Sequence, residues 1–287
     1  SYILLDRPGL SWVFEQLGEA IDDHLDLIRL DEVWRMVWPD GQSLAIYDSL
    51  DRTADTLDAA FPGTGARYRA FVARMEPHLD RLTPLQHRRP PSPLEMLHPR
   101  RVASVPFLLR PLAAHLAGFP PRVQKLLGAW TRVAGQSIDA APAALALLPA
   151  SLHRHGAYVP RGGMLQIGEA LARIAVRAGV QLRLCTPVRA LERDGRRITH
   201  LQVGEERLPV DAVTSNAPGI STLLGLLQPP VVRPSLARLP LQSPGLAVYG
   251  VTTDRGDAPF LTFTPSSSGM NLRIVFGAAA KVTIPGR

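Results

Sequence analysis

The sequence predicts a mixed α/β fold in which strand-rich segments flank a mainly helical one. Three patterns support this prediction. Asp40-Gly41 joins two runs of strand-forming residues, as the turn of a β-hairpin does. Apolar residues then recur at helical spacing in several segments between residues 51 and 153. From residue 158 onward a helix, a strand, an antiparallel meander and a further strand are expected in that order.

The first elements are expected to be a short helix and the hairpin. Leu10–Leu17 places its apolar side chains at helical spacing. The runs Val33–Trp38 and Ser43–Tyr47 are rich in strand-forming residues and flank the Asp-Gly turn. Two amphipathic helices follow, at Asp51–Ala60 and Ala66–Leu82. The second carries a continuous apolar stripe, which is typical of a helix with one buried face.

A basic, proline-rich connector is predicted at residues 83–101. Each proline removes a backbone donor and clashes with the preceding helical turn, so this stretch is expected to be extended. Beyond it, long apolar faces predict three further helices. They cover Val102–Leu116, Arg122–Val133 and Ala141–His153.

From residue 157 the pattern changes to alternating elements. Residues 165–178 form a helical stripe, and Gly179 ends it as a C-terminal capping glycine does. A buried strand is expected at Val180–Leu184, so the single cysteine, Cys185, is expected to be buried and inert. The other predicted strands are Val188–Arg193, 198–203, Leu208–Val210, Asp211–Asn216, Gly245–Thr252, Phe260–Phe263 and Leu272–Phe276.

Charge and composition narrow the function classes. The chain has 287 residues, a net charge of +7 and a pI near 10.3, which favours anionic partners. Such partners include acidic lipid, nucleic acid and a phosphorylated cofactor, although a surface of scattered arginines explains the charge equally well. One cysteine rules out an internal disulfide framework and a cysteine-based metal site. No uncharged apolar run reaches the roughly 18 residues that a membrane span needs.

The residues from Tyr158 to Ala217 carry a specific resemblance to a known family. Tyr158-Val-Pro-Arg-Gly-Gly-Met164 is followed by a helix, a glycine-led strand, Thr186-Pro-Val188, a β-meander and Asp211-Ala-Val-Thr-Ser-Asn-Ala217. In this order and spacing, the segment resembles flavin-dependent desaturases of the phytoene desaturase and amine oxidase kind. The opening residues and the hairpin are similar to that family too, so the resemblance covers most of residues 1–250.

The resemblance implies a fragment of a FAD-binding Rossmann-like domain with an inserted, mainly helical substrate domain. Residues 1–41 and 158–225 would belong to the FAD-binding part. Residues 42–157 would form the substrate domain, which would also face a membrane. Residues 226–287 would begin a second, substrate-side β region.

Five residues are expected by resemblance to contact FAD. Extended chain at Pro187 and Val188 would offer backbone groups to the adenine, with Pro187 removing one donor and fixing the approach. The loop of Ser215, Asn216 and Ala217 would follow a strand end that points at the cofactor, where ligands of open α/β sheets collect. Small residues there let the backbone come close to a ligand. An ordinary strand-to-helix loop with an Asn turn is the alternative interpretation.

Arg161, Gly162 and Gly163 precede a predicted helix N-terminus, where anions often bind. A Gly-Gly pair is also a common way to turn tightly before a helix. We therefore expect the glycines to serve the conformation of the turn. Arg161 is expected to line the substrate or flavin side.

Two cofactor-binding motifs of the family are not found in this sequence. No G-x-G-x-x-G occurs, and the nearest match, Gly63-Thr-Gly65, follows no hydrophobic strand. That motif would hold the FAD pyrophosphate at a helix N-terminus. The family's C-terminal glycine-rich flavin segment is not found either. We therefore expect a partial chain that by itself binds FAD weakly or not at all and is inactive.

The predicted function is that of a FAD-dependent oxidoreductase of the carotenoid desaturase type. By resemblance, the whole enzyme would remove hydride and a proton from a hydrophobic polyene, and a quinone or oxygen would reoxidise the flavin. No carboxylate or histidine stands out by spacing as the catalytic acid or base. Two alternatives remain open. One is an amine oxidase or protoporphyrinogen oxidase relative, and the other is a non-enzymatic lipid- or partner-binding module.

The remaining polar clusters predict little chemistry. His153 and His155 lack a neighbouring cluster of acids or cysteines, so they are interpreted as solvated histidines at a helix end, and no metal site is expected. The basic connector Arg88–Arg101 is either a membrane-surface element or a solvated loop. The expected location is the cytoplasm, with membrane association left open. Nucleic acid is not an expected partner, because no recognised binding module occurs.

Overall fold

The computed structural model describes residues 3–86, 98–133, 135–228, 230, 260–266 and 269–274. The chain divides into two compact units. Unit 1 comprises Ser1–Ile174 and Gln242–Arg287, and unit 2 comprises Ala175–Leu241. Helices and strands occur in both units, so the predicted mixed α/β class is confirmed. The Rossmann-like FAD-binding part with an inserted helical domain stays a prediction. The predicted division at residues 41, 157 and 225 stays a prediction.

Unit 1 is built on a four-stranded sheet with the order β10-β9-β2-β3. β2 (Glu32–Val37) pairs antiparallel with β3 (Ser43–Tyr47), as the Asp-Gly turn predicts, and Gly41 has a φ of +83° in that turn. β9 (Leu261–Ser266) lies parallel to β2 and antiparallel to β10 (Gly269–Ile274). Two predicted strand regions far apart in the sequence therefore share one sheet.

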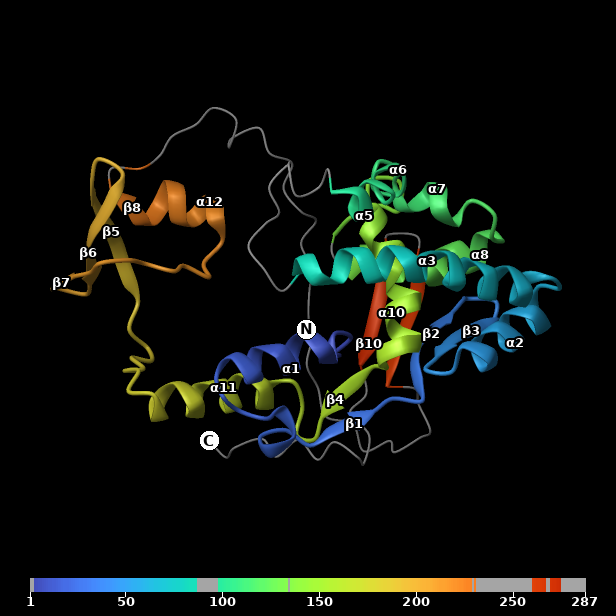
Figure 1. Cartoon of the computed structure of the whole chain (residues 1–287), viewed down its shortest axis with the longest axis horizontal. Helices are drawn as coiled ribbons and strands as arrows, with labels where there is room; N and C mark the ends of the chain where they lie inside the picture. The colour runs from blue at the N-terminus through green and yellow to red at the C-terminus, as the bar shows by residue number, and fades with distance from the viewer. Residues whose placement is uncertain are drawn as a thin grey trace. The chain divides into compact units, whose positions relative to one another are not determined.

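Two long helices in unit 1 bury their apolar stripes. The hydroxyl of Ser49 caps α2 (Leu50–Ala60) by accepting from the backbone N–H of Arg52. α3 (Thr64–Gln86) runs beside α2 and α10 (Leu148–His155) in Figure 1. Its buried side chains are those that the sequence predicts, namely Tyr68, Phe71, Val72, Met75 and Leu79. They belong to one hydrophobic cluster with the sheet side chains.

The three helices predicted between residues 102 and 153 are broken into shorter pieces. Pro111 has an extended conformation just before α7 (Leu112–Leu116). Gly128 follows the end of α8 (Pro121–Leu127), and a Cβ on Gly128 would lie 2.7 Å from Ile138 Cδ1. Proline and glycine thus override the apolar periodicity. The pieces are α6 (Val105–Leu108), α7 (Leu112–Leu116), α8 (Pro121–Leu127), α9 (Ala129–Val133), η2 (Ala143–Leu147) and α10.

The expectation of an extended connector is wrong at both of its described ends. α3 continues through Pro84 to Gln86, giving up one backbone hydrogen bond at the proline. α5 (Pro99–Val102) begins at a proline, where the missing N–H has no partner to lose. Residues 87–97, most of the connector, lie outside the described residues.

A two-stranded ribbon and two helices complete unit 1. β1 (Leu27–Arg29) pairs antiparallel with β4 (Tyr158–Pro160). Phe14 of α1 and Ile174 of α11 belong to a second, smaller cluster that also includes Ile21. The elements concerned are α1 (Arg7–Gln16), η1 (Ile21–Asp23) and α11 (Leu165–Arg177), whose last turn belongs to unit 2. Gly179 has a φ of +87°, as the predicted cap requires.

Unit 2 contains the predicted meander, in a sheet with the order β7-β6-β5-β8. β5 (Val188–Asp194), β6 (Arg197–Val203) and β7 (Glu206–Pro209) are antiparallel neighbours. β8 (Leu227–Gln228) pairs in parallel with β5 through Leu191. Gly195 and Gly204 have positive φ in the two connecting turns, which explains the sharp reversals.

Two predicted strands of unit 2 are wrong. Val180–Leu184 and Asp211–Asn216 form no strand, and the first is exposed rather than buried. Cys185, expected to be buried, is exposed and has a φ of +54°. A strand needs a neighbouring strand for its backbone groups, and among the described residues no strand pairs with either segment. Apolar alternation alone did not decide the outcome.

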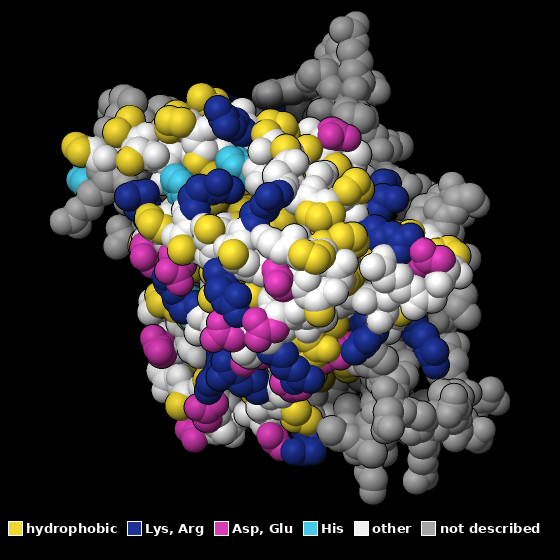
Figure 2. Space-filling model, turned by 90° about the vertical axis from the view of Figure 1, so that its right-hand side faces the viewer, with side chains coloured by type: hydrophobic (Ala, Val, Ile, Leu, Met, Phe, Trp, Pro, Cys, Tyr) yellow, Lys and Arg dark blue, Asp and Glu magenta, His cyan; other side chains and the backbone are white. Residues whose placement is uncertain are grey.

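The described surface of unit 1 carries many arginine–carboxylate pairs. Arg69 of α3 reaches Asp51 at 2.9 Å and Asp55 at 2.7 Å on α2. Lys/Arg and Asp/Glu side chains are interleaved in this way over the lower part of the face in Figure 2. Exposed pairs of this kind contribute little stability. They show that some of the arginines are paired on the surface, so these arginines do not require an anionic ligand.

Candidate cofactor-facing site

Pro187 and Val188 lie where β5 begins. Val188 pairs with Val203 of β6, and its side chain is 37% exposed. A register irregularity follows between Val188 and Ala190. Among the described residues, no backbone–backbone hydrogen bond reaches residues 181–187, although the hydroxyl of Thr186 donates to the carbonyl of Leu184 at 2.8 Å. The start of β5 therefore has peptide groups available for a ligand or for another segment.

The loop of Ser215, Asn216 and Ala217 is short, exposed and held together by its own polar groups. The backbone N–H of Ala217 donates to Ser215 Oγ at 3.3 Å, and Ser215 Oγ lies 3.2 Å from Thr222 Oγ1. Pro218 then precedes α12 (Gly219–Ser221), which continues into η3 (Thr222–Leu226).

Two segments of unit 2 are predicted to contact the cofactor, and both are placed relative to β5. Pro187 and Val188 lie at its start, and the loop of residues 215–217 is held by η3, which packs on β5. η3 packs against β5, whose first residue is Val188, and the hydroxyl of Thr222 at its start holds the loop. The strand end that was expected to direct the loop of residues 215–217 at the cofactor does not form, so the loop is placed only by its contacts with η3. The role of these five residues stays a prediction.

The Arg161-Gly162-Gly163 turn in unit 1 has the conformation that its glycines allow. Gly162 and Gly163 have φ of +89° and +92°, which supports the expected conformational role. The backbone N–H of Gly163 donates to Pro160 O at 2.8 Å. Arg161 is exposed and its Nε lies 2.5 Å from Asp26 Oδ2. Its role beside substrate or flavin stays a prediction.

Tyr158 lies between two arginines that sequence reasoning missed. The guanidinium carbons of Arg7 and Arg29 lie 5.2 and 6.0 Å from the centre of its ring. Gly156, with a φ of +79°, allows the close approach, because a Cβ there would lie 3.0 Å from Arg29 Nε. Arg29 in turn pairs with Asp48 at 2.9 Å. The arginines come from α1 and β1, so only the folded chain brings them to the motif that starts at Tyr158.

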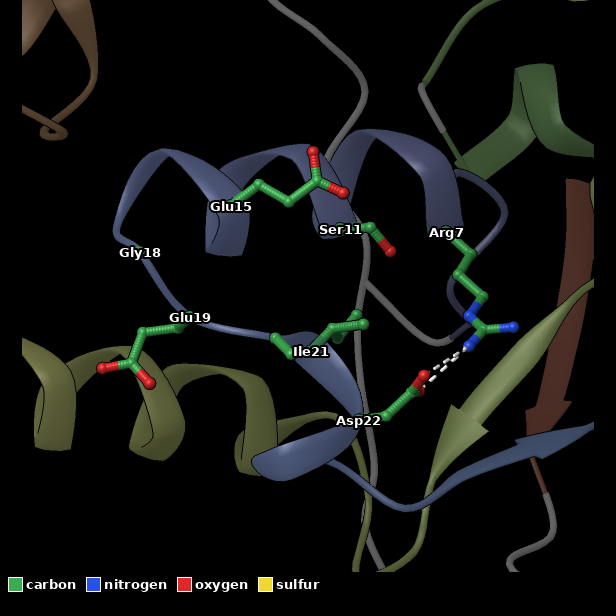
Figure 3. A pocket seen from close by; sticks show the side chains of 8 residues that line it. Arg7, Ser11, Glu15, Gly18, Glu19, Ile21 and Asp22 are labelled. Carbon is green, nitrogen blue, oxygen red and sulfur yellow. Dashed lines mark hydrogen bonds and ion pairs between the residues drawn. The ribbon is translucent and has the colours of Figure 1, made fainter.

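A hollow of about 470 Å³ lies beside Arg7 (Figure 3). Ser11 and Glu15 line it from α1, and Arg7 donates to both carboxylate oxygens of Asp22, at 2.9 and 3.2 Å. Glu19 also lines it and pairs with His24 at 2.8 Å. The lining includes none of the predicted site residues, and its acidic groups do not suit a phosphorylated cofactor.

His153 is not the solvated histidine that the sequence suggests. Its Nδ1 donates to the carbonyl of Asp48 at 2.9 Å, and its Nε2 lies 2.8 Å from the hydroxyl of Tyr68. Burial lowers the pKa of His153 below its usual value. His155 is half-buried, and burial lowers its pKa as well. Within the described ranges, no three His, Cys, Asp or Glu side chains are grouped as a metal site.

The sequence matches the family described as FAD dependent oxidoreductase over residues 109–285. It is 32% identical over 255 residues to a phytoene dehydrogenase of Streptomyces griseus, covering 84% of this chain and 48% of that protein. It is 30% identical to a zeta-carotene-forming phytoene desaturase of Myxococcus xanthus, covering 71% and 41%. A phytoene desaturase of Neurospora crassa is also 30% identical, covering 78% and 40%.

Among solved structures, a putrescine oxidase redesigned in its cofactor binding aligns with a TM-score of 0.48 and 14% sequence identity, covering 81% of this chain and 49% of that one. The chain spans about half the length of the curated relatives that it matches. It is a member of the FAD-dependent oxidoreductase family, and it resembles the phytoene and carotenoid desaturases within that family.

Proposed function

We propose that this chain is part of an enzyme that desaturates a hydrophobic polyene, with FAD as the electron acceptor. The supporting observation is its similarity to proteins named phytoene dehydrogenase and phytoene desaturase, over 84% and 71% of its length. Forming one carbon–carbon double bond removes a hydride and a proton from two neighbouring carbons. FAD would accept the hydride, the proton would pass to water, and a quinone or oxygen would reoxidise the reduced flavin.

The protein's part in this reaction would be binding and orientation, because the cofactor carries the redox chemistry. We infer that the start of β5, at Pro187 and Val188, faces the adenine half of FAD. The loop of Ser215, Asn216 and Ala217 would lie against the cofactor with little steric hindrance. Arg161, with its glycine turn, would lie on the substrate or flavin side.

No catalytic base is proposed. His153 is the most deeply buried histidine with a shifted pKa, but both of its ring nitrogens are engaged within unit 1. It therefore has no free nitrogen to accept a substrate proton.

The function is tested by expressing the complete reading frame that contains this sequence in cells that accumulate phytoene. We expect the cells to form coloured carotenoids, because each new double bond extends the conjugated chain, and pigment absorbance measures this. Colourless extracts from cells that contain FAD-loaded protein would contradict the proposal. A protein that is purified without flavin and binds lipid would instead support the non-enzymatic alternative.

Within that full-length protein, Ala217→Leu is expected to lower FAD occupancy. A leucine at this exposed loop would fill the space that we assign to the cofactor, at a cost of about 1–3 kcal/mol, or roughly 5- to 150-fold in affinity. The measurement is the ratio of flavin to protein absorbance after dialysis against a range of FAD concentrations.

Ala59→Leu is the matched control, because Ala59 is an exposed alanine on α2 in unit 1. It should leave the FAD affinity unchanged. Equal FAD affinity in the two variants would remove the loop from the proposed site, whatever the outcome of the pigment experiment.

None of the helices in the described part of the chain is long and apolar enough to cross a membrane. The proposed membrane contact of the connector Arg88–Arg101 falls mainly on residues outside that part. That contact and the expected cytoplasmic location stay predictions.

A further inference from the structure

The Arg161-Gly162-Gly163 turn of unit 1 takes its position from β4, the strand that precedes it. The backbone N–H of Gly163 donates to Pro160 O, and that of Arg161 donates to Asp26 O, both at 2.8 Å. Asp26 directly precedes β1, which is the partner strand of β4. A shift of β4 relative to β1 would therefore move the turn.

The ribbon of β1 and β4 is short. Each strand has three residues, and a two-stranded ribbon is marginally stable by itself. Leu4 adds one bridge, because its N–H donates to Tyr158 O at 2.8 Å and its carbonyl accepts from the N–H of Tyr158 at 2.9 Å. Tyr158 also pairs with Arg29 of β1, so three segments of the chain meet at this residue. Contacts of its side chain can therefore decide how firmly β4 is held.

The ring of Tyr158 contacts two guanidinium groups. The guanidinium carbons of Arg7 on α1 and Arg29 on β1 lie 5.2 and 6.0 Å from the ring centre. The Arg7 guanidinium also donates a hydrogen bond to Tyr158, which raises the pKa of Arg7. Tyr158 is only 7% exposed, and a cation at a ring shielded from water is attracted more strongly than one in open solvent.

Carboxylates fix both guanidinium groups. Arg7 donates to the two oxygens of Asp22 at 2.9 and 3.2 Å (Figure 3), and Arg29 pairs with Asp48 at 2.9 Å. The carbonyl of Asp48 in turn accepts from Nδ1 of His153 on α10. The tyrosine ring is thus connected through Arg7 to α1 and η1, and through Arg29 to α10.

The contact between Arg29 and Tyr158 leaves no space for another side chain. Gly156 has a φ of +79°, and a Cβ on it would lie 3.0 Å from Arg29 Nε and 3.2 Å from the hydroxyl oxygen of Tyr158. Both the backbone conformation and the lack of space require glycine here. The arginine and the tyrosine therefore keep one relative position.

These contacts are separate from the hydrophobic cores. Tyr158 belongs to neither hydrophobic cluster, although its neighbours Ala157 and Val159 belong to the larger one. Loosening the contacts of the ring should therefore change β4 and the following turn locally. The helices and the four-stranded sheet should stay folded.

We propose that Arg7 and Arg29 are positioning residues, which hold the ring of Tyr158 and thereby keep the Arg161-Gly162-Gly163 turn in the conformation that FAD binding requires. We call Arg7, Arg29 and Tyr158 the tyrosine clamp. The proposal rests on the proposed function, since that function assigns the turn to the substrate or flavin side. The clamp acts on the turn with or without flavin, so its effect can be measured in both states.

The first test is hydrogen exchange in the 287-residue chain, which needs no flavin. Arg7→Gln and Arg29→Gln each replace one guanidinium at the ring by a neutral polar group. A cation at a ring contributes a factor of roughly two to five. The N–H groups of Arg161 and Gly163 should therefore exchange roughly two- to fivefold faster, as measured by mass spectrometry on peptides that span the turn. Unchanged exchange in both variants overturns the proposal, and unchanged exchange in one removes that arginine from the clamp.

Arg122→Gln is the matched control. The guanidinium carbon of Arg122 lies 5.2 Å from the ring centre of Trp38, and Arg122 pairs with Asp40, so it makes the same kinds of contact elsewhere in unit 1. This variant should leave exchange at the turn unchanged.

A conservative variant separates charge from side-chain volume. Arg29→Lys keeps a cation near the ring, so exchange at the turn should be slower than in Arg29→Gln. Equal exchange in these two variants would contradict a role of the charge. Circular dichroism checks that each variant is folded. Should a glutamine variant not fold, Tyr158→Phe removes only the hydroxyl that Arg7 bonds and should also speed exchange.

The second test measures FAD affinity in the complete protein that contains this sequence. Arg7→Gln and Arg29→Gln should weaken FAD binding by roughly two- to fivefold, followed by the quenching of flavin fluorescence, whereas Arg122→Gln should not. Arg29→Lys should bind FAD more tightly than Arg29→Gln. Faster exchange at the turn together with wild-type FAD affinity would contradict the clamp and leave the proposed function standing. A wild-type protein that binds no FAD would instead contradict the proposed function, and the role of the clamp with it.

Discussion

Trp34→Ala is expected to lower the free energy of unfolding of unit 1 by about 3–5 kcal/mol, the usual range for a deleted core tryptophan. Trp34 is fully buried on β2, and its Nε1 donates to the carbonyl of Leu126 on α8 at 3.3 Å. Its ring also meets that of Trp130 edge-on at 5.7 Å. The substitution leaves a cavity between the sheet and the helices and removes the indole donor from the carbonyl of Leu126. Urea unfolding followed by circular dichroism measures the loss.

Trp12→Ala is the matched control, because it removes the same side chain from an exposed position on α1. Trp12 is 37% exposed and belongs to neither hydrophobic cluster. We expect a loss below about 1 kcal/mol, the range of ordinary surface substitutions. Comparable losses in the two variants would mean that the sheet and the helices are not stabilised through Trp34.

Local patterns predicted those elements whose partners lie nearby in the sequence. The Asp-Gly hairpin at residue 41, the stripe of α3 and the meander after Val188 are each determined by turns and periodicity within about 30 residues. The joining of β9 to β2 depends on residues more than 200 positions apart, and no local pattern specifies it. Pro111 and Gly128 break the helices although the apolar periodicity continues past both, so periodicity alone does not locate the breaks.

The strand predicted at Val180–Leu184 shows the limit of periodicity. Val180, Leu182 and Leu184 alternate with polar residues, as in a strand that buries one face. In the structure they are 50%, 50% and 83% exposed. On the other side of the chain, Arg183 pairs with Glu206 of β7 at 2.8 Å. Apolar alternation indicates that a segment can join a sheet. Whether it does depends on a partner strand, which the segment's own sequence does not specify.

The candidate site divides in the same way. Val188 and the residues from Ser215 to Ala217 could be named from their order in the motif, because the family pattern is sequential. The arginines beside Tyr158 could not, since Arg7 and Arg29 precede it by more than 120 residues. The burial of His153 depends on distant residues in the same way. Its partners, Tyr68 and Asp48, lie 85 and 105 residues away.

His153 also makes the stability of unit 1 depend on pH. Its Nδ1 proton is donated to a carbonyl, so in the neutral ring Nε2 accepts from the hydroxyl of Tyr68. Burial depresses the pKa of His153 in the folded chain below its usual value. The unfolded chain therefore takes up the proton first as the pH falls. The stabilisation is complete above about pH 6.5 and is lost as the pH falls from there toward the lower folded pKa.

His153→Gln is accordingly expected to flatten the pH dependence of unfolding below about pH 6.5, where the neutral glutamine gives no proton uptake. His78, His115 and His155 have lowered pKa values too and will maintain part of the slope. Tyr68→Phe should cost about 1–3 kcal/mol near neutral pH, because the buried Nε2 loses its donor. Denaturant unfolding at a series of pH values tests both. If the free energy of unfolding of His153→Gln changed with pH as steeply as that of the wild type, His153 would have the same pKa in the folded and unfolded chain. That result would contradict the effect of burial proposed here.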